Sequence, residues 1–190
     1  MSIYDRNDPI ESDAGSEEEL DALPEASFDD PPSDAEAGGN TWTVRLLAMP
    51  LLVLFAVPTI FLGLGRSSLW EPDEPRFAEA SREMLASGDR LTPYFNGEPA
   101  FDEPILFYWF QAVTFDRLGV SEYAARMPAG LAGLGCLLLV ALIGARLFSA
   151  RAGLLAGLAL ATTFRFVVST RSGVPDTALL FFTLAALYAF

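Results

Sequence analysis

The chain has 190 residues, of which 52% are hydrophobic, and its formal net charge is −13. It contains no histidine and no lysine, which excludes histidine-based metal sites, histidine general bases and lysine nucleophiles. Thirteen acidic residues lie within residues 1–40 beside a single arginine, Arg6, whereas residues 41–190 carry 12 acids and 11 arginines. An acidic segment therefore precedes an apolar, almost neutral body that has no basic stripe, and nucleic-acid binding is not expected.

Residues 1–40 are rich in Asp, Glu, Ser, Pro, Gly and Ala and show no apolar periodicity. Such a composition cannot bury enough apolar surface to offset the entropy lost on ordering. We therefore predict a disordered acidic tail over 1–40, with an acidic docking segment as the alternative. Residues 41–190 are predicted to form the N-terminal part of a membrane domain.

Four segments of this domain are predicted to span a membrane: about 46–65, 128–148, 152–170, and 176–190 onward. The first contains 20 uncharged residues between Arg45 and Arg66, enough for a helix to cross the hydrocarbon core. The third has an uncharged run of only 13 residues and so includes Arg165. This arginine either has a buried partner or reaches the membrane interface. The sequence ends inside the fourth segment, and we expect a longer protein.

The arginines suggest an orientation. Arg146 and Arg151 bracket the tight turn between the second and third segments, and positively charged residues favour the cytoplasmic side. The N-terminus is then cytoplasmic, in a cell inner or plasma membrane, and residues 66–127 form the first large non-cytoplasmic loop. Arg165 and Arg171 count against this orientation.

Two short helices are predicted in this loop. Pro75 suits the first position of a helix capped by Asp73 or Glu74, and Gly88 is a natural stop. A second, aromatic-rich helix is expected to start near Pro104, with a composition that suits a membrane interface or a packed core.

Acidic residues recur at the starts of helices on the expected outer face. Asp73 and Glu74 open the first loop helix, Asp102 and Glu103 precede the second, and Asp176 opens the last span. In a chain without histidine, a carboxylate is the natural general base, and arginines bind phosphate well. Candidate arginines on the same face are Arg76, Arg126, Arg165 and Arg171. The pattern fits transfer from a lipid-phosphate donor to a hydroxyl group; helix caps and surface ion pairs are the structural alternative.

The stretch DEPRFAEASREMLASGDRLTPYFNGEPAFDEPILFYWF, followed by GVSEYAARMPAGLAGL, resembles the N-terminal part of the dolichyl-phosphate-mannose–protein mannosyltransferase-like family. It is most similar to the bacterial branch that includes the lipid A aminoarabinose transferase. The resemblance implies a GT-C fold, all-α and polytopic, with short amphipathic helices in the first outer loop. It also implies a polyprenyl-phosphate sugar donor, Asp73 as the base, and Asp176 as the second acid.

This chain departs from the bacterial branch at Glu103, where a phosphate-binding lysine is usual. Arg165 or Arg171 is the alternative source of positive charge. No metal motif is present, although a divalent ion between Asp73 and Asp176 is conceivable.

The resulting hypothesis is an integral-membrane glycosyltransferase that moves a sugar to a lipid, glycan or protein hydroxyl on the non-cytoplasmic face. The alternatives are a transporter or flippase-like protein, or an inactive relative. The predicted catalytic residues are Asp73 and Glu74, and the predicted substrate-binding residues are Arg76, Glu103, Tyr108, Arg126, Arg165, Arg171 and Asp176.

Overall fold

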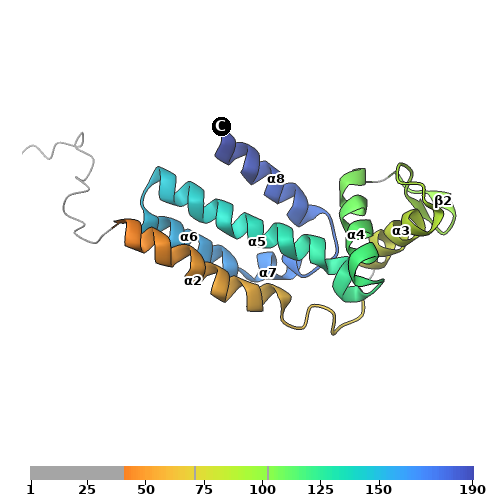
Figure 1. Ribbon diagram of the computed structural model, residues 1–190, viewed down its shortest axis with the longest axis horizontal. Coiled ribbons are helices and arrows are strands. Elements are labelled where there is room, and N and C mark those ends of the chain that lie inside the picture. The colour runs from red at the N-terminus through yellow and green to blue at the C-terminus, as the bar shows by residue number, and fades with distance from the viewer. Residues whose placement is uncertain (1–40, 71, 102) are drawn as a thin grey trace, which may run out of the picture. The chain divides into compact units, whose positions relative to one another are not determined.

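The computed structural model describes residues 41–70, 72–101 and 103–190, with side chains from Leu47 onward. The predicted acidic tail, Glu71 and Asp102 lie outside the described residues. The predominantly helical fold expected from the sequence is confirmed (Figure 1). The helices are α2 (Thr41–Phe61), α3 (Asp73–Ser87), α4 (Ile105–Leu118), α5 (Glu122–Leu147), α6 (Ala150–Thr162), α7 (Phe164–Thr170) and α8 (Asp176–Ala189).

A small β-hairpin interrupts the helical pattern between α3 and α4. Strands β1 (Tyr94–Phe95) and β2 (Glu98–Pro99) pair antiparallel around Asn96 and Gly97. Both turn residues have positive φ, 53° and 80°, which is the requirement of the tight hairpin turn that Asn-Gly favours. Their backbone amides donate to the Glu83 carboxylate at 2.9 and 3.3 Å, which attaches the hairpin to α3.

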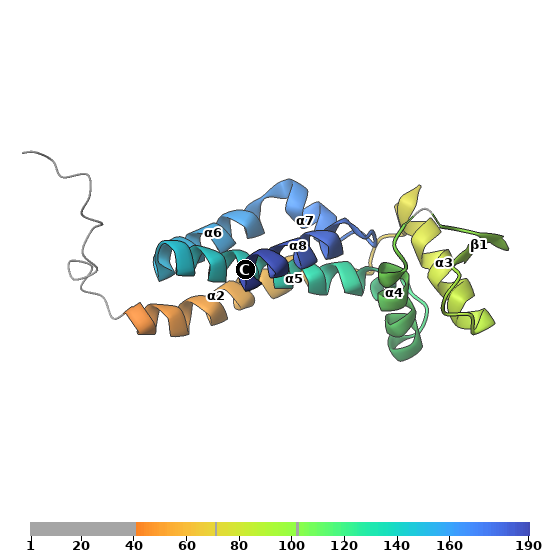
Figure 2. The same ribbon diagram turned by 90° about the horizontal axis from the view of Figure 1, so that it is seen from above.

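Helix α5 lies at the centre of the helical bundle, in contact with α2, α4, α6 and α8 (Figures 1 and 2). Its buried face consists mostly of small residues and meets α2 and α6 in an apolar core. This core contains Leu52, Ala56, Ile60, Cys136, Leu137, Ala141, Ala161 and Phe166. Helices α3 and α4 lie at one end of the bundle, and α4 contacts α5 (Figure 2).

Among the described residues, one helix is long and apolar enough to cross a membrane by itself, namely α5 with its 26 residues. Helices α6 and α7 together would make a second such segment if they count as one span. Leu47–Phe61 and α8 are apolar but shorter. The four spans expected from the sequence fall on these helices, and their passage through a membrane stays a prediction.

The predicted third span is not a straight helix, because its axis bends by 72° between α6 and α7. Thr162 and Thr163 explain the break. Their hydroxyls donate to the carbonyls of Leu158 and Ala159 at 2.8–3.0 Å, and the Thr163 amide donates to the Leu160 carbonyl instead of to Ala159. The bend redirects α7, so that Arg165 is exposed.

Helices α5 and α6 approach closely through glycines. Gly153 and Gly157 of α6 are both buried at helix contacts. A Cβ on Gly153 would overlap the Ala141 carbonyl oxygen of α5, and one on Gly157 would lie 2.8 Å from Leu52 of α2 and 3.3 Å from the Ala141 side chain. Only glycine leaves room for this separation of the two backbones.

Gly153→Ala is therefore expected to destabilise the protein by about 1–3 kcal/mol, since the new methyl group meets backbone that cannot rotate away. The measurement is thermal unfolding of the full-length protein in detergent. Ala159→Leu, on the exposed side of the same helix, adds more atoms and is the control. Equal melting temperatures for wild type and Gly153→Ala would contradict this packing.

Helix α3 ends where the sequence predicted. Gly88 adopts the left-handed conformation, φ 72°, and its amide donates to the Met84 carbonyl. The start differs from the prediction, because Pro72 occupies the capping position and neither Asp73 nor Glu74 caps the helix. The side chain of Glu74 is used elsewhere. Helices α3 and α4 pack through Phe77, Ala80, Met84, Phe107 and Tyr108, in a cluster that also includes Ala178 of α8.

Candidate active site

A polar cavity of about 430 Å³ lies where three parts of the chain converge. The first turn of α3 supplies Asp73, Glu74 and Arg76, and the segment just before α4 supplies Glu103. Helix α7, helix α8 and the segment between them supply the opposite side. Of the predicted site residues, the cavity brings together Asp73, Glu74, Arg76, Glu103, Arg165 and Asp176.

The charged groups of this cavity differ in how they are held. Asp73, Glu103, Arg165 and Asp176 are exposed to solvent. Within the described ranges, no side-chain hydrogen bond or ion pair engages Asp73, Arg165 or Asp176. These groups are therefore available to a ligand.

Glu74, in contrast, is buried and fully engaged. Its carboxylate receives hydrogen bonds from Arg126 Nε at 3.0 Å and Nη2 at 2.8 Å. It also accepts from the backbone amides of Trp70 and Gly173. Four donors on one carboxylate make Glu74 a junction between α3, α5 and the segment before α8.

The environment of Glu74 also sets its charge. Burial by itself would raise its pKa, but hydrogen bonds from Arg126 and from the amides of Trp70 and Gly173 outweigh burial and lower the pKa below 4.5. Glu74 is therefore ionised at neutral pH. A carboxylate with this many fixed donors is suited to holding structure, whereas the neighbouring Asp73 is exposed to solvent.

Arg126 is the buried partner of this junction, with 4% of its surface exposed. Besides Glu74, it donates to the carbonyls of Leu64, Ser67 and Ser68 at 2.8–3.0 Å. Protein acceptors thus use every nitrogen of the guanidinium. Sequence reasoning proposed Arg126 as a ligand for the donor phosphate. In the structure, its side chain instead binds Glu74 and the backbone of the segment that follows α2.

Two other predicted residues lie outside the cavity lining. Arg171 donates to the carbonyls of Thr59 and Ile60 at 2.8 and 2.9 Å and of Leu62 at 3.0 Å. It satisfies carbonyls at the end of α2, which lack partners within the helix. Tyr108 is buried against Phe77, with ring centroids 5.8 Å apart, and burial raises the pKa of its hydroxyl while Arg76 opposes and Glu103 adds to that shift.

The sequence analysis missed several residues at this site. Ser169 and Ser172 line the cavity, and Gly173 binds Glu74. The polar run around Ser172 and Gly173 beside Pro175-Asp176 was the available signal. Within the described ranges, no cluster of three or more His, Cys, Asp or Glu side chains could hold a metal ion.

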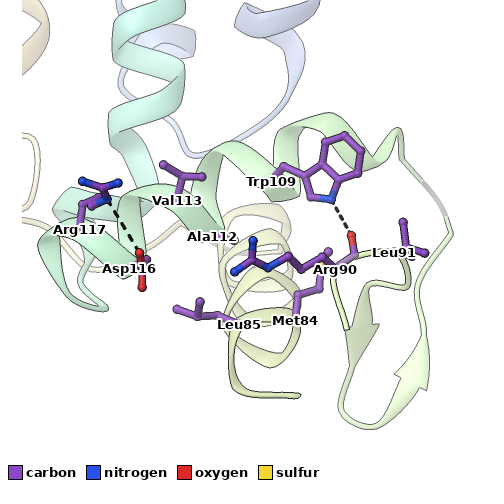
Figure 3. A pocket seen from close by; sticks show the side chains of 9 residues that line it. All are labelled: Met84, Leu85, Arg90, Leu91, Trp109, Ala112, Val113, Asp116 and Arg117. Carbon is purple, nitrogen blue, oxygen red and sulfur yellow. Dashed lines mark hydrogen bonds and ion pairs between the residues drawn. The ribbon is translucent and has the colours of Figure 1, made fainter. Parts of the chain in front are cut away.

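A second cavity, of about 460 Å³, lies between the C-terminal halves of α3 and α4 (Figure 3). Its walls are mainly apolar, formed by Met84, Leu85, Leu91, Trp109, Ala112 and Val113. Trp109 donates to the Arg90 carbonyl, and Asp116 lies 3.9 Å from Arg117 (Figure 3). The one carboxylate that lines the second cavity is thus paired with an arginine. The first cavity, which has acids without such a partner among the described residues, is better suited to proton transfer.

Comparisons with known proteins identify the proteins to which this chain is similar. Residues 102–190 match the family described as dolichyl-phosphate-mannose-protein mannosyltransferase. An uncharacterised protein of Aquifex aeolicus is 31% identical over 75% of this chain and 28% of its own length. An undecaprenyl phosphate-alpha-4-amino-4-deoxy-L-arabinose arabinosyl transferase of Aeromonas hydrophila is 40% identical over 51% of this chain and 17% of its own length.

The fold is similar to a solved structure as well. ArnT from Cupriavidus metallidurans, in the crystal structure bound to undecaprenyl phosphate, superposes with a TM-score of 0.70 at 32% identity. The match covers 79% of this chain and 27% of that protein. The chain thus spans about a third or less of the relatives it matches. The family resemblance seen in the sequence is confirmed over this region.

Proposed function

We propose that this chain, which is related to the dolichyl-phosphate-mannose–protein mannosyltransferase family, is part of a membrane glycosyltransferase. The enzyme would move a sugar from a polyprenyl-phosphate donor to a hydroxyl group of a lipid, glycan or protein. One observation carries the proposal: Asp73 and Asp176, about a hundred residues apart in sequence, line the same cavity as Arg165.

Each side of the cavity has a role in this reaction. The free Asp73 carboxylate would accept the proton of the acceptor hydroxyl as its oxygen attacks the anomeric carbon of the sugar. The bond from that carbon to the phosphate oxygen breaks, and the lipid phosphate leaves with its negative charge. Arg165 and Arg76 are the cavity-lining cations that would stabilise this charge.

Glu103 would weaken binding of the donor phosphate. It lies in the same cavity, where its negative charge repels a bound phosphate. We propose that Arg165 compensates, because α7 bends it toward this cavity and its donors are not used by other described side chains. Arg126 and Arg171 are less suited, since protein carbonyls and Glu74 already accept from them.

The proposed orientation places the cavity on the non-cytoplasmic side of a cell membrane. The cavity lies near the N-terminus of α5, whereas Arg146 and Arg151 lie at or beyond its C-terminal end. A helix of 26 residues rises about 39 Å, which separates the two ends by more than the hydrocarbon thickness. Arginines at the far end support a cytoplasmic turn and a cytoplasmic N-terminus.

The test is sugar transfer by the full-length protein in membranes, using a panel of labelled polyprenyl-phosphate sugars. Label would be followed into lipid, glycan and protein fractions. Transfer that depends on the protein supports the proposal. A folded, membrane-inserted protein that transfers none of the sugars would contradict it and favour the transporter or inactive-relative readings.

The role of Arg165 gives a separate prediction. Arg165→Gln removes a charge-assisted contact to phosphate, so kcat/KM for the donor should fall by about 10- to 100-fold. Steady-state transfer at varied donor concentration measures it. Arg151→Gln, which changes an exposed arginine in the first turn of α6, is the matched control. Equal values for the two variants would remove Arg165 from the donor site.

A further inference from the structure

A single amide lies within the otherwise apolar buried face of α4. Gln111 has no exposed surface, and its side chain contacts three separate elements. Its Oε1 accepts from the Ser81 hydroxyl of α3 at 2.9 Å. Its Nε2 donates to the Ala125 carbonyl of α5 at 2.9 Å and to the Gly173 carbonyl at 3.3 Å. Both ends of the amide are thus satisfied by protein groups.

The residue that receives the last of these bonds is held from both sides. The Gly173 amide donates to the Glu74 carboxylate, and its carbonyl accepts from Gln111. A Cβ at this position would lie 3.2 Å from the Ala125 carbonyl oxygen and 3.4 Å from Gln111 Nε2. Gly173 is therefore packed against the start of α5 and tied to α3 and α4.

This attachment bears on the geometry of the cavity. Gly173 lies between α7, which carries Arg165 and Ser169, and α8, which begins at Asp176. Asp73 comes from the opposite side, in the first turn of α3. The position of Gly173 relative to α3 therefore sets how far Asp176 and Arg165 lie from Asp73.

We propose that Gln111 is a positioning residue for the active site, because its bond to Gly173 fixes the α7–α8 segment opposite Asp73. The inference rests on the proposed glycosyl transfer. A positioning role differs from a role in general stability. The hydrogen bonds of Gln111 with Ser81 and Ala125 already join α3, α4 and α5, and neither partner lines the cavity. The bond to Gly173 is the one that reaches the cavity wall.

Two neighbouring hydroxyls provide matched controls. Thr114, one turn along α4, donates to the Ala124 carbonyl and so joins α4 to α5 without contacting Gly173. Ser81 bonds the other end of the Gln111 amide. Thr114→Val removes a part-buried hydroxyl that bonds the Gln111 and Ala124 carbonyls, and Ser81→Ala removes one buried hydrogen bond between α3 and α4. In contrast, Gln111→Leu also releases Gly173.

The experiment compares Gln111→Leu, Thr114→Val and Ser81→Ala in the full-length membrane protein. Transfer kinetics give kcat and donor KM, and hydrogen–deuterium exchange follows the peptide over residues 171–177. For Gln111→Leu we expect kcat to fall by about 100-fold, the scale of a misplaced reacting group, with a smaller change in KM. Exchange over 171–177 should also become faster. The two controls should stay near wild type in both measurements.

Gln111→Met is nearly the same length as glutamine but has no N–H to donate to Gly173, so it should behave like Gln111→Leu. It replaces the leucine variant if that one does not fold. Wild-type kcat in a folded Gln111 variant, or equal losses in the controls, would overturn the proposal. If the wild type transfers no sugar, the proposed function fails. Hydrogen–deuterium exchange then still tests whether Gln111 holds Gly173 in place. Unchanged exchange over 171–177 in the Gln111 variants would show that it does not.

Discussion

Asp73→Asn is expected to reduce sugar transfer by about 10²- to 10⁴-fold, the contribution usual for a general base. Asparagine has nearly the same shape but cannot take a proton from the acceptor hydroxyl. The Asp73 side chain is exposed, and no side-chain bond to another described residue holds it, so the fold should survive the change. The measurement is transfer from a labelled polyprenyl-phosphate sugar by wild type and variant in membranes at equal protein amounts.

Asp116→Asn is the matched control for this experiment. Asp116 is an exposed acid on α4, outside the candidate active site, and its loss should leave transfer near the wild-type rate. Asp176→Asn tests which of the two cavity acids, Asp73 or Asp176, is the general base. If Asp176→Asn abolishes transfer while Asp73→Asn retains it, the base is Asp176; if Asp73→Asn and wild type transfer equally, Asp73 has no role in proton transfer.

The local parts of this site could be read from the sequence. Proline and acidic residues mark the starts of α3, α4 and α8, and Gly88 marks the end of α3, because these preferences depend on the backbone within one turn. The same signals identified Asp73, Glu103 and Asp176, which the fold brings to one cavity. The hydrophobic runs likewise gave the approximate positions of the long helices.

What sequence reasoning could not supply depends on contacts between distant residues. Glu74 and Arg126 are 52 positions apart, and nothing local shows that one arginine is buried in an ion pair while another, Arg165, faces a cavity. Arg171 was an equal candidate for phosphate until its bonds to the end of α2 were seen. The bend after α6 depends on two threonine hydroxyls, whose choice of acceptor is a property of the folded chain.

The contacts of Glu74 with Arg126, Trp70 and Gly173 favour a different role from the one predicted for it. The sequence analysis named it with Asp73 as a predicted catalytic residue. The buried network around it favours a supporting role instead, because a carboxylate with four donors and a lowered pKa is a poor proton acceptor at neutral pH. Under the proposed function, Glu74 supports the site, and the adjacent Asp73 would face the substrate.

The second large effect is expected from Arg126→Met, which should destabilise the protein by about 3–5 kcal/mol. Methionine fills much of the arginine's volume but leaves the Glu74 carboxylate buried without its charged partner. It also leaves the carbonyls of Leu64, Ser67 and Ser68 without a donor. The measurement is unfolding of the full-length protein in detergent. Arg82→Met, which breaks an exposed pair with Glu79, should cost less than about 1 kcal/mol.

A double-mutant cycle with Glu74→Gln and a pH series complete this test. Glu74 has a lower pKa in the folded protein than in the unfolded chain, so its stabilisation is present above pH 4.5 and is lost as the pH falls through the folded value. The wild type should therefore lose stability below pH 4.5, and Glu74→Gln should lose less over the same range. The two single changes should be strongly non-additive, because either one already breaks the pair. Additive effects, or the same acid sensitivity with and without Glu74, would mean that this pair does not hold the site together.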